Sequence, residues 1–439
     1  MSVTAAQGFR AAGVAAGLKS SGKPDVALVV NDGPQFAAAG VFTRNRVKAA
    51  PVLWSQQVLT SGVVRAVVLN SGGANACTGP AGFLDTHRTA EHAATLMDIG
   101  AGDVAVCSTG LIGVRLETDL LFAGLDSAQA ALTADGGAAA ATAIMTTDSV
   151  PKTATVTGPF TVGGMAKGAG MLAPSLATML VVVTTDACAD AATLDTALRS
   201  AARVTFDRVD SDGCTSTNDT VLLLASGASG VEPALDELTA AVTAVCADLA
   251  RQLVADAEGA SKEIRIDVIN AASEDDAVDA GRSISRANLV KCAIHGEDPN
   301  WGRILAELGM TAAAFEPDAV DVAINGVWVC RDGATGDDRD LVDMSGREVV
   351  ITVDLRAGDA SATIWTNDLT ADYVHENSAY SSGTNPSTAT SIATSHCSRP
   401  PCSPRPFRGS SASTARPSSS STAATPWSTA PSARHLPPT

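Results

Sequence analysis

The chain has 439 residues, of which 45% are hydrophobic, so it is long enough for two or three packed lobes with a sizeable core. A formal net charge of -17 without a long lysine and arginine cluster argues against nucleic acid and anionic membrane surfaces as partners. No apolar run approaches the roughly 18 to 20 residues that span a bilayer, and the first residues lack the apolar core of a secretory signal. We therefore expect a cytoplasmic protein that acts on small molecules.

Short apolar segments alternate with helical periodicities along the chain. Strands are predicted in DVALVV (25–30), AVVLN (66–70), MLVVV (179–183), IRIDVI (264–269) and VVITVDL (349–355). One amphipathic helix is predicted behind Thr193, with Leu194, Ala197, Leu198, Ala201 and Ala202 on its apolar face, and a longer helix carries the stripe from Leu235 to Leu253. A third helix is predicted over 274–290, behind the capping-box-like SEDD at Ser273, and Asn325-Gly326 predicts a tight hairpin turn. This mixture predicts an α/β or α+β layered architecture.

The nine cysteines are scattered, with no C-x-x-C pair and no histidine at zinc-ligand spacing. We therefore expect reduced thiols and no metal site. Cys107 and Cys214 lie in segments that read as polar, glycine-containing loops, which makes each an alternative nucleophile. Neither has a neighbouring residue in the sequence that would activate it.

Several loops are rich in small polar residues. They include LNSGGANACTG (69–79), CSTGLIG (107–113), MTTDSVPK (145–152) and DSDGCTSTNDT (210–220). Each alone is explained as a cluster of turns. Together they are suited to hold carboxylates and oxyanions through backbone amides and hydroxyls. GLKSSGKP (17–24) nearly matches a nucleotide-binding loop, but Pro24 stands where a magnesium-binding hydroxyl is required, so no nucleotide cofactor is expected.

The segment AKGAGMLAPSLATMLVVVTTD (166–186) places Thr178 between a glycine- and proline-containing run and a strand that reads as buried on both faces. A threonine hydroxyl needs a base, and no histidine is close in the sequence. If the Ala177–Thr178 bond is cut, the new α-amine, with a pKa of about 8, can take the hydroxyl proton. The same hydroxyl can make the cut by attacking the carbonyl of Ala177 to form an ester that water opens.

These residues carry a resemblance to a known family. KGAGMLAPSLATML resembles the self-cleavage segment of the ornithine acetyltransferase family, the bifunctional enzymes of arginine biosynthesis. GFRAAGVAAGLK (8–19), GVFTRNRVKAAPV (40–52), NSGGANACTG, CSTGLIG, MTTDSVPK, STNDT, DAEGASK (256–262), GEDPNWGR (296–303) and ENSAYSS (376–382) match in the same order. The resemblance spans residues 8 to 382 and implies layered α/β sandwich-type lobes.

The resemblance also implies chemistry. It implies self-cleavage into an α chain of residues 1–177 and a β chain of residues 178–382, an α2β2 assembly, and Thr178 as the nucleophile that carries acetyl from N-acetylornithine to glutamate. Thr109 and Gly110 correspond to the oxyanion hole. The substrate-binding positions correspond to Thr146, Lys167, Thr178, Glu258, Asn377 and Ser382. Some relatives also use acetyl-CoA as donor, and the resemblance implies no bound cofactor.

The charges of the substrate fit two of these positions. N-acetylornithine carries an α-carboxylate and a side-chain ammonium, so we expect Lys167 to bind the former and Glu258 the latter. An ordinary loop lysine and a solvated glutamate at a helix end are the alternatives for these residues. Asn218 and Asp219 are interpreted as residues that brace loops, with their roles open.

The sequence departs from the family pattern in three places. Ser175 and Leu176 stand where the family more often has Asn and Met, and Gly73 replaces a usual Asn. From Gly383 to Thr439 the chain holds 10 of its 20 prolines and no acidic residue, which predicts disorder. Such a bias is what an out-of-frame reading of GC-rich coding sequence gives, and our hypothesis is a frameshift. The family chain typically ends at the position of Ser382, with its last residues near the substrate. A tail attached there can displace this chain end, and with it Asn377 and Ser382, from the substrate.

Two other classes of protein remain open at this stage. An N-terminal-nucleophile amidohydrolase or aminopeptidase would share the cut threonine and the oxyanion loop, and it would release acetate without glutamate. A non-catalytic binding protein would keep its chain whole, and replacing Thr178 would not alter its ligand binding.

Overall fold

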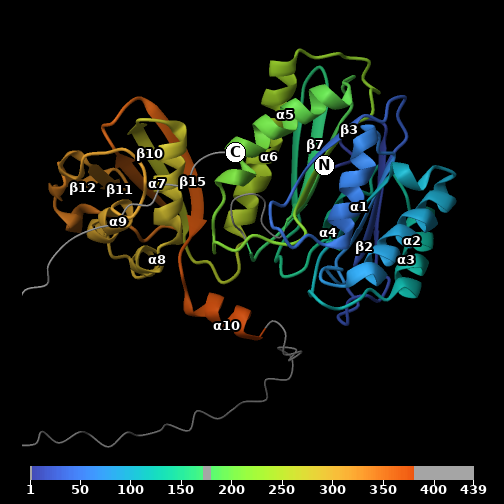
Figure 1. Ribbon diagram of the computed structural model, residues 1–439, viewed down its shortest axis with the longest axis horizontal. Coiled ribbons are helices and arrows are strands. Elements are labelled where there is room, and N and C mark those ends of the chain that lie inside the picture. Colours follow the sequence, from blue (N-terminus) through green and yellow to red (C-terminus); the bar gives the residue numbers. More distant parts are fainter. Residues whose placement is uncertain (1, 172–178, 380–439) are drawn as a thin grey trace, which may run out of the picture. The chain divides into compact units, whose positions relative to one another are not determined.

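Three mixed β-sheets organise the described residues, 2–171 and 179–379, in the computed structural model (Figure 1). The first sheet has the strand order β1-β2-β4-β5, with β4 and β5 parallel and the other neighbours antiparallel. Its strands are β1 (Phe9–Val14), β2 (Val26–Asn31), β4 (Ala66–Asn70) and β5 (Val104–Ser108). Helices α2 (Gly79–Met97) and α3 (Thr118–Ala130) bury one face of this sheet in a shared apolar cluster.

The second sheet has the order β3-β9-β8-β7-β6 and contains the parallel pair β8 and β9. Its strands are β3 (Ala38–Phe42), β6 (Lys152–Thr157), β7 (Thr161–Lys167), β8 (Leu180–Thr185) and β9 (Thr220–Ala225). Helices α5 (Ala191–Val204) and α6 (Leu235–Ala255) cover one face. The other face packs on the first sheet, together with residues of α1 (Ala50–Val58) and α4 (Gly137–Ala143). Four layers therefore follow one another: helices, sheet, sheet, helices.

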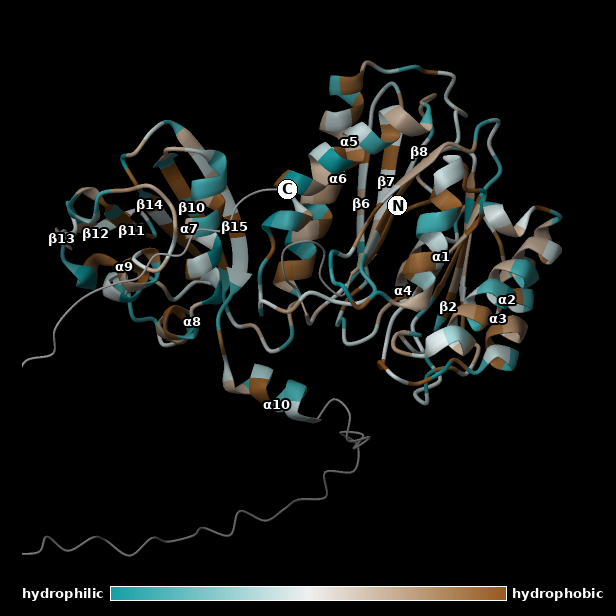
Figure 2. Ribbon diagram, in the orientation of Figure 1, coloured by the Kyte–Doolittle hydropathy of each residue, from teal (hydrophilic) through white to brown (hydrophobic). Residues whose placement is uncertain are grey.

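Strand β8 shows why its sequence is apolar without interruption. Leu180 and Val182 point into the cluster between the two sheets, whereas Val181 and Val183 point into the cluster under α5 and α6. Side chains alternate between the faces of a strand, so a strand covered on both faces needs an apolar residue at each position. In Figure 2 the labelled strand β8 is coloured toward the hydrophobic end of the scale. The prediction of a strand buried on both faces is confirmed.

The third sheet has the order β13-β12-β11-β14-β10-β15. Its strands are β10 (Glu263–Ala271), β11 (Asp321–Ile324), β12 (Val327–Arg331), β13 (Ala334–Thr335), β14 (Glu348–Asp354) and β15 (Ala360–Asn367). Helices α7 (Glu274–Arg286), α8 (Asn288–His295) and α9 (Trp301–Leu308) contribute to its apolar cluster, and α10 (Ala371–Ala379) follows β15. The predicted hairpin turn joins β11 to β12, with positive φ at Asn325 (47°) and Gly326 (84°), as a primed turn requires.

Two helix boundaries differ from the sequence predictions. Helix α5 begins at Ala191, three residues before the predicted start behind Thr193, and its N-cap is Asp190, whose side chain accepts the N–H of Thr193. The predicted helix over 274–290 is two helices, because Ala287 is extended (φ -70°, ψ 104°) and ends α7 at Arg286. Ser273 caps α7 as predicted, since its side chain accepts the N–H of Asp276.

Helix α6 is longer and more apolar than expected from the sequence. It is the helix in the described part of the chain that is long and apolar enough to cross a membrane by length and composition alone. Its stripe is fully buried from Leu238 to Leu253 in the cluster beneath the second sheet, whereas Leu235, the first residue of the helix, is 45% exposed. The stripe is therefore used for core packing, as predicted. The observed layers confirm the α/β sandwich-type class.

Candidate active site

A cavity of about 380 Å³ lies where loops from the first and second sheets meet. Its walls come from the segments after β4, β5, α4, β7 and α6, from the segment before β9, and from α10. The lining residues are Ala74, Thr109, Gly110, Leu111, Ile112, Thr146, Thr147, Lys167, Gly170, Met171, Ser216, Thr217, Asn218, Glu258 and Asn377. Six residues proposed for the site from the sequence are among them: Thr109, Gly110, Thr146, Lys167, Glu258 and Asn377. Ala177, Thr178 and Ser382 lie outside the described residues.

The loop after β5 is fixed by its neighbours. The N–H of Thr109 donates to Asn70 O (3.0 Å), and the side-chain amide of Asn218 donates to the carbonyls of Ser108 (2.8 Å) and Ala74 (2.6 Å). Gly110 has a φ of 133°, and a Cβ there would lie 2.8 Å from the backbone nitrogen of Gly73. A glycine is therefore required at this position.

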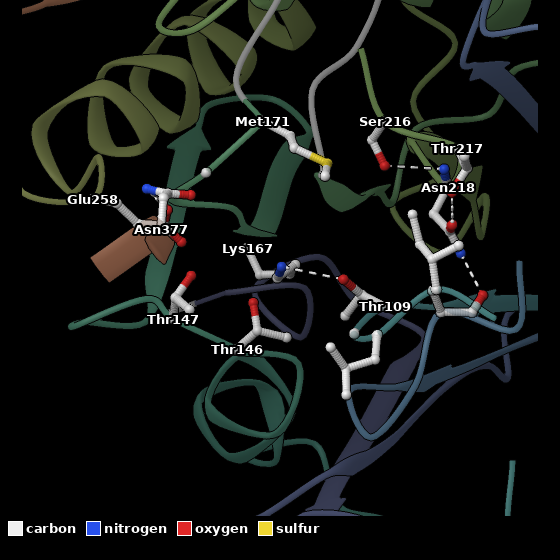
Figure 3. A pocket seen from close by; sticks show the side chains of 15 residues that line it. Thr109, Thr146, Thr147, Lys167, Met171, Ser216, Thr217, Asn218, Glu258 and Asn377 are labelled. Atoms are coloured by element: carbon white, nitrogen blue, oxygen red, sulfur yellow. Dashed lines mark hydrogen bonds between the residues drawn. The ribbon is translucent and has the colours of Figure 1, made fainter. Parts of the chain in front are cut away.

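Lys167 lies at the end of β7 and is only 1% exposed. Its Nζ donates to Thr109 Oγ1 at 3.3 Å and is 4.0 Å from Asp148 Oδ2. Burial lowers the pKa of Lys167, and the nearby carboxylate of Asp148 acts in the opposite direction. When Lys167 is charged it can only donate, so Thr109 must use a lone pair for this contact and keeps its own O–H for another acceptor. Figure 3 shows Lys167 directed toward Thr109.

One buried carboxylate holds two of the predicted binding residues. Asp148 Oδ2 accepts the N–H of Thr146 (2.9 Å), and Oδ1 accepts the N–H of Gly168 (2.6 Å), next to Lys167. Oδ1 also accepts from Lys152 Nζ (2.6 Å), a fully buried lysine that bonds Asp256 as well (2.5 Å). Burial raises the pKa of Asp148, but the charges of Lys167 and Lys152 and these hydrogen bonds outweigh it and lower the pKa to about 2. Asp148 is therefore ionised at neutral pH.

Glu258 and Asn377 lie together at another side of the cavity. Glu258 sits in the turn between α6 and β10, where its N–H donates to Ala169 O (2.9 Å). Its Oε2 accepts from Asn377 Nδ2 at 3.0 Å. Gly170 leaves room for this carboxylate, because a Cβ there would lie 2.5 Å from Oε2. In Figure 3 Glu258 and Asn377 lie on one side of Lys167 and Thr109 lies on the other.

Asp219 directly precedes β9 and follows Asn218, which lines the cavity. The parallel register pairs Leu180 with Thr220, so the preceding residues, Met179 and Asp219, are adjacent. Asp219 Oδ1 accepts the N–H of Met179 at 3.1 Å. This contact places a carboxyl group beside the backbone nitrogen of Met179.

Neither Cys107 nor Cys214 is well suited to serve as the nucleophile. Cys107 lies in strand β5 and not in a loop; it is buried, and burial raises its pKa to about 12, which works against a thiolate. Cys214 is exposed in a loop, and partial desolvation of its thiol together with the charge of Asp212 raises its pKa as well. Within residues 2–171 and 179–379 no group of three or more His, Cys, Asp or Glu side chains is placed to hold a metal ion.

Several lining residues were not identified from the sequence. Thr147, Leu111, Ile112 and Met171 lie inside the motifs named above, but nothing in those motifs singled them out as cavity residues. Asp148 and Lys152 lie in MTTDSVPK, and the sequence did not indicate that their side chains form a buried ion pair. Asn218 had been interpreted as a loop brace, and its two bonds to the carbonyls of Ser108 and Ala74 fit that interpretation.

The chain is similar in sequence to the proteins of one family. A sequence profile described as "ArgJ family" matches residues 10–382. The arginine biosynthesis bifunctional protein ArgJ of Streptomyces coelicolor is 70% identical over 383 residues, which cover 87% of this chain and 100% of that protein. The protein of the same name from Thermobifida fusca is 64% identical over 382 residues, with the same coverage. The structure of ornithine acetyltransferase from Mycobacterium tuberculosis, complexed with ornithine, is 64% identical with a TM-score of 0.40 and covers 40% of this chain and 96% of that chain.

Proposed function

The chain belongs to the ArgJ family, and from this premise we propose that it is an ornithine acetyltransferase that moves acetyl from N2-acetylornithine to glutamate in arginine biosynthesis. The relatives' name describes them as bifunctional. We infer that the second activity is the acetylation of glutamate with acetyl-CoA as donor, with no bound cofactor. The proposal includes a cytoplasmic location.

The nucleophile in this proposal is Thr178, which self-cleavage at the Ala177–Thr178 bond frees as the first residue of the β chain. Its α-amine takes the proton of its hydroxyl, and the hydroxyl oxygen attacks the acetyl carbonyl of N-acetylornithine. Collapse of the tetrahedral intermediate breaks the C–N bond, releases ornithine with the returned proton and leaves acetyl-Thr178. The amine of glutamate then attacks this ester, and N-acetylglutamate leaves.

Thr109 and Gly110 are proposed to stabilise the tetrahedral oxyanion. The contact with Lys167 leaves the Thr109 O–H free to donate, which supports this role. The bonds from Asn218 fix the loop, so the donors need little rearrangement when charge develops. The positive charge of Lys167 beside the oxyanion position adds to the stabilisation.

The substrate is proposed to lie across the cavity. Lys167 binds its α-carboxylate, Glu258 binds the side-chain ammonium of ornithine, and the apolar side chains of Leu111 and Ile112 contact the methylene groups between. Thr146, Asn377 and Ser382 complete the proposed binding residues. A cavity of about 380 Å³ is within the size range of small-molecule sites.

One observation carries the proposal: six residues that were chosen from scattered loops line one cavity, with a cation and a carboxylate among them. The α chain (1–177), the β chain (178–382) and their α2β2 assembly belong to the same proposal. So does a tail (383–439) that contributes nothing to catalysis; the family match ends at residue 382. A chain ending at Ser382 should therefore be at least as active as the full chain.

The test is an assay of three products. Purified protein is incubated with N-acetylornithine, with and without glutamate, and ornithine, N-acetylglutamate and acetate are measured. Acetyl transfer predicts N-acetylglutamate in equal amount to ornithine, and none with Thr178→Ala. Steady release of acetate without glutamate would instead identify a hydrolase. A wild-type chain that stays uncut, and that binds N-acetylornithine as tightly as Thr178→Ala does, would identify a binding protein.

A further inference from the structure

Self-cleavage raises a chemical problem that the mature enzyme does not have. In the mature enzyme the α-amine of Thr178 serves as the base. In the uncut precursor this nitrogen is an amide, which has no basic lone pair, so the hydroxyl of Thr178 needs another proton acceptor for its first attack. This inference rests on the proposed function, and it concerns which residue supplies that acceptor.

Three charged residues of the site are already engaged. Asp148 accepts from Lys152 and from two backbone amides, and its pKa of about 2 makes it a weak base. Lys167 donates to Thr109 and lies beside the Asp148 carboxylate. Glu258 accepts from Asn377 at the other side of the cavity. None of the three contacts the backbone next to the cleavage point in the part of the chain that the structure describes.

Asp219 differs from these three residues in two ways: one of its carboxyl oxygens has no partner among the described residues, and the other contacts the backbone next to the cleavage point. Its side chain is fully buried, and Oδ1 accepts the N–H of Met179, the nitrogen of the peptide bond that follows Thr178. The second oxygen, Oδ2, is also buried and has no hydrogen-bond partner among the described residues. A buried carboxyl oxygen without a partner is costly, and natural proteins keep such groups mainly where they have a function.

We propose that Asp219 is the general base of the self-cleavage reaction. Asp219 Oδ2 takes the proton from the Thr178 hydroxyl while its oxygen forms a bond to the carbonyl carbon of Ala177. The C–N bond to Thr178 then breaks, and the proton passes from Asp219 to the departing nitrogen, which becomes the free α-amine. Water opens the resulting ester, giving the carboxylate of Ala177 and restoring the Thr178 hydroxyl.

The surroundings of Asp219 support its basicity. Burial raises the pKa of Asp219 well above its ordinary value. The Met179 N–H, the neighbouring hydroxyls of Ser216 and Thr43 and the charge of Lys167 act in the opposite direction without cancelling the effect of burial. A carboxylate with a raised pKa holds a transferred proton more firmly than an ordinary aspartate does.

The position also follows from the fold. Strands β8 and β9 are parallel and in register, so the residues before each strand lie side by side at the same edge of the sheet. The N–H of Thr220 donates to Met179 O (3.1 Å), and together with the bond from Met179 to Asp219 it fixes the two segments to each other. The carboxyl group is therefore held in place before any cleavage occurs.

The experiment follows cleavage with time after cell-free synthesis, using intact mass, for the wild type and Asp219→Asn. Asparagine keeps an oxygen for the Met179 N–H but cannot accept a proton, so cleavage should slow by roughly 10²-fold or more. Asp210→Asn is the matched control, since Asp210 is likewise fully buried with one oxygen that has no partner among the described residues, and it pairs with Arg286 in another part of the chain. This control should be cleaved at the wild-type rate.

A second variant separates a chemical defect from a structural one. Replacing the nucleophile by Thr178→Cys supplies a thiol that ionises without a strong base, so it should restore cleavage to the Asp219→Asn chain. Should Asp219→Asn fail to fold by circular dichroism, Asp219→Glu carries the same test, because its displaced carboxyl should slow cleavage and Thr178→Cys should restore it. Wild-type cleavage rates in a folded Asp219→Asn chain, or no recovery with Thr178→Cys, would overturn the inference. An uncut wild type would instead contradict the proposed self-cleavage itself.

Discussion

The substitution Glu258→Gln separates the two halves of the proposed reaction. Glutamine has the same shape and keeps an oxygen for the hydrogen bond from Asn377, but it removes the negative charge that we assign to the ornithine ammonium. A hydrogen bond to a charged group contributes about 1.5 to 3 kcal/mol. At 1.4 kcal/mol for each factor of ten, kcat/KM for N-acetylornithine should fall roughly 10- to 150-fold.

Glutamate provides the internal comparison. Its side chain carries no ammonium, so kcat/KM for glutamate should not fall when Glu258 becomes neutral. Ornithine release measures the first half-reaction, and N-acetylglutamate formation at saturating N-acetylornithine measures the second. Glu232→Gln is the matched control, because it removes an exposed charge before the other end of α6 and should change neither constant. An equal loss for both substrates, or no loss for N-acetylornithine, would refute the assignment of Glu258.

Three further substitutions test the surrounding structure. Gly110→Ala, whose Cβ would meet the nitrogen of Gly73 at 2.8 Å, should displace the oxyanion loop and lower kcat by about 10²-fold in the transfer assay. Lys152→Met should lower the free energy of unfolding, measured with urea, by about 3 to 5 kcal/mol, because it leaves the buried charge of Asp148 poorly compensated. Burial lowers the pKa of Lys291 to about 8, below its unfolded value of 10.5. Below pH 8 the buried charge therefore destabilises the folded protein. The free energy of unfolding, compared with that of Lys291→Met, should rise by up to about 3 kcal/mol from pH 8 to 10.5, because the unfolded chain binds more protons in this range.

Each of these three has an outcome that contradicts it. Unchanged kcat in Gly110→Ala would mean that the loop tolerates a side chain at this point. A Lys152→Met chain as stable as the wild type would show that Asp148 finds another partner or takes up a proton. For Lys291, a stability difference between the wild type and Lys291→Met that stays constant from pH 8 to 10.5 would mean that the lysine keeps an ordinary pKa in the folded protein.

The strands and several site loops were predictable from the sequence because local pattern decides them. The uninterrupted apolar run of β8 requires cover on both faces, and the packing of the two sheets and of α5 and α6 provides it. The positions of Thr109, Lys167 and Glu258 came from the family resemblance, and the sequence by itself did not indicate that they line one cavity. Their meeting depends on how the two sheets stack, which no local pattern encodes.

Other features depend on contacts between distant residues. The bond between Lys152 and Asp256 joins positions 104 residues apart, and the sequence shows two ordinary charges there. Cys107 was expected in a polar loop because of the residues that follow it, but its strand ends only at Ser108. The first turn of α5 was misplaced by three residues, since Asp190 and Thr193 are both suitable caps and the backbone conformation decides between them.

The central claim is that acetyl is carried on Thr178. The most direct measurement is the intact mass of the purified protein after brief exposure to N-acetylornithine, followed by addition of glutamate. The account predicts two fragments, of which the one beginning at Thr178 gains the mass of one acetyl group and loses it when glutamate is added. A fragment that never gains this mass while N-acetylglutamate accumulates, or an acetyl group carried by a different residue in peptide mapping, would contradict it.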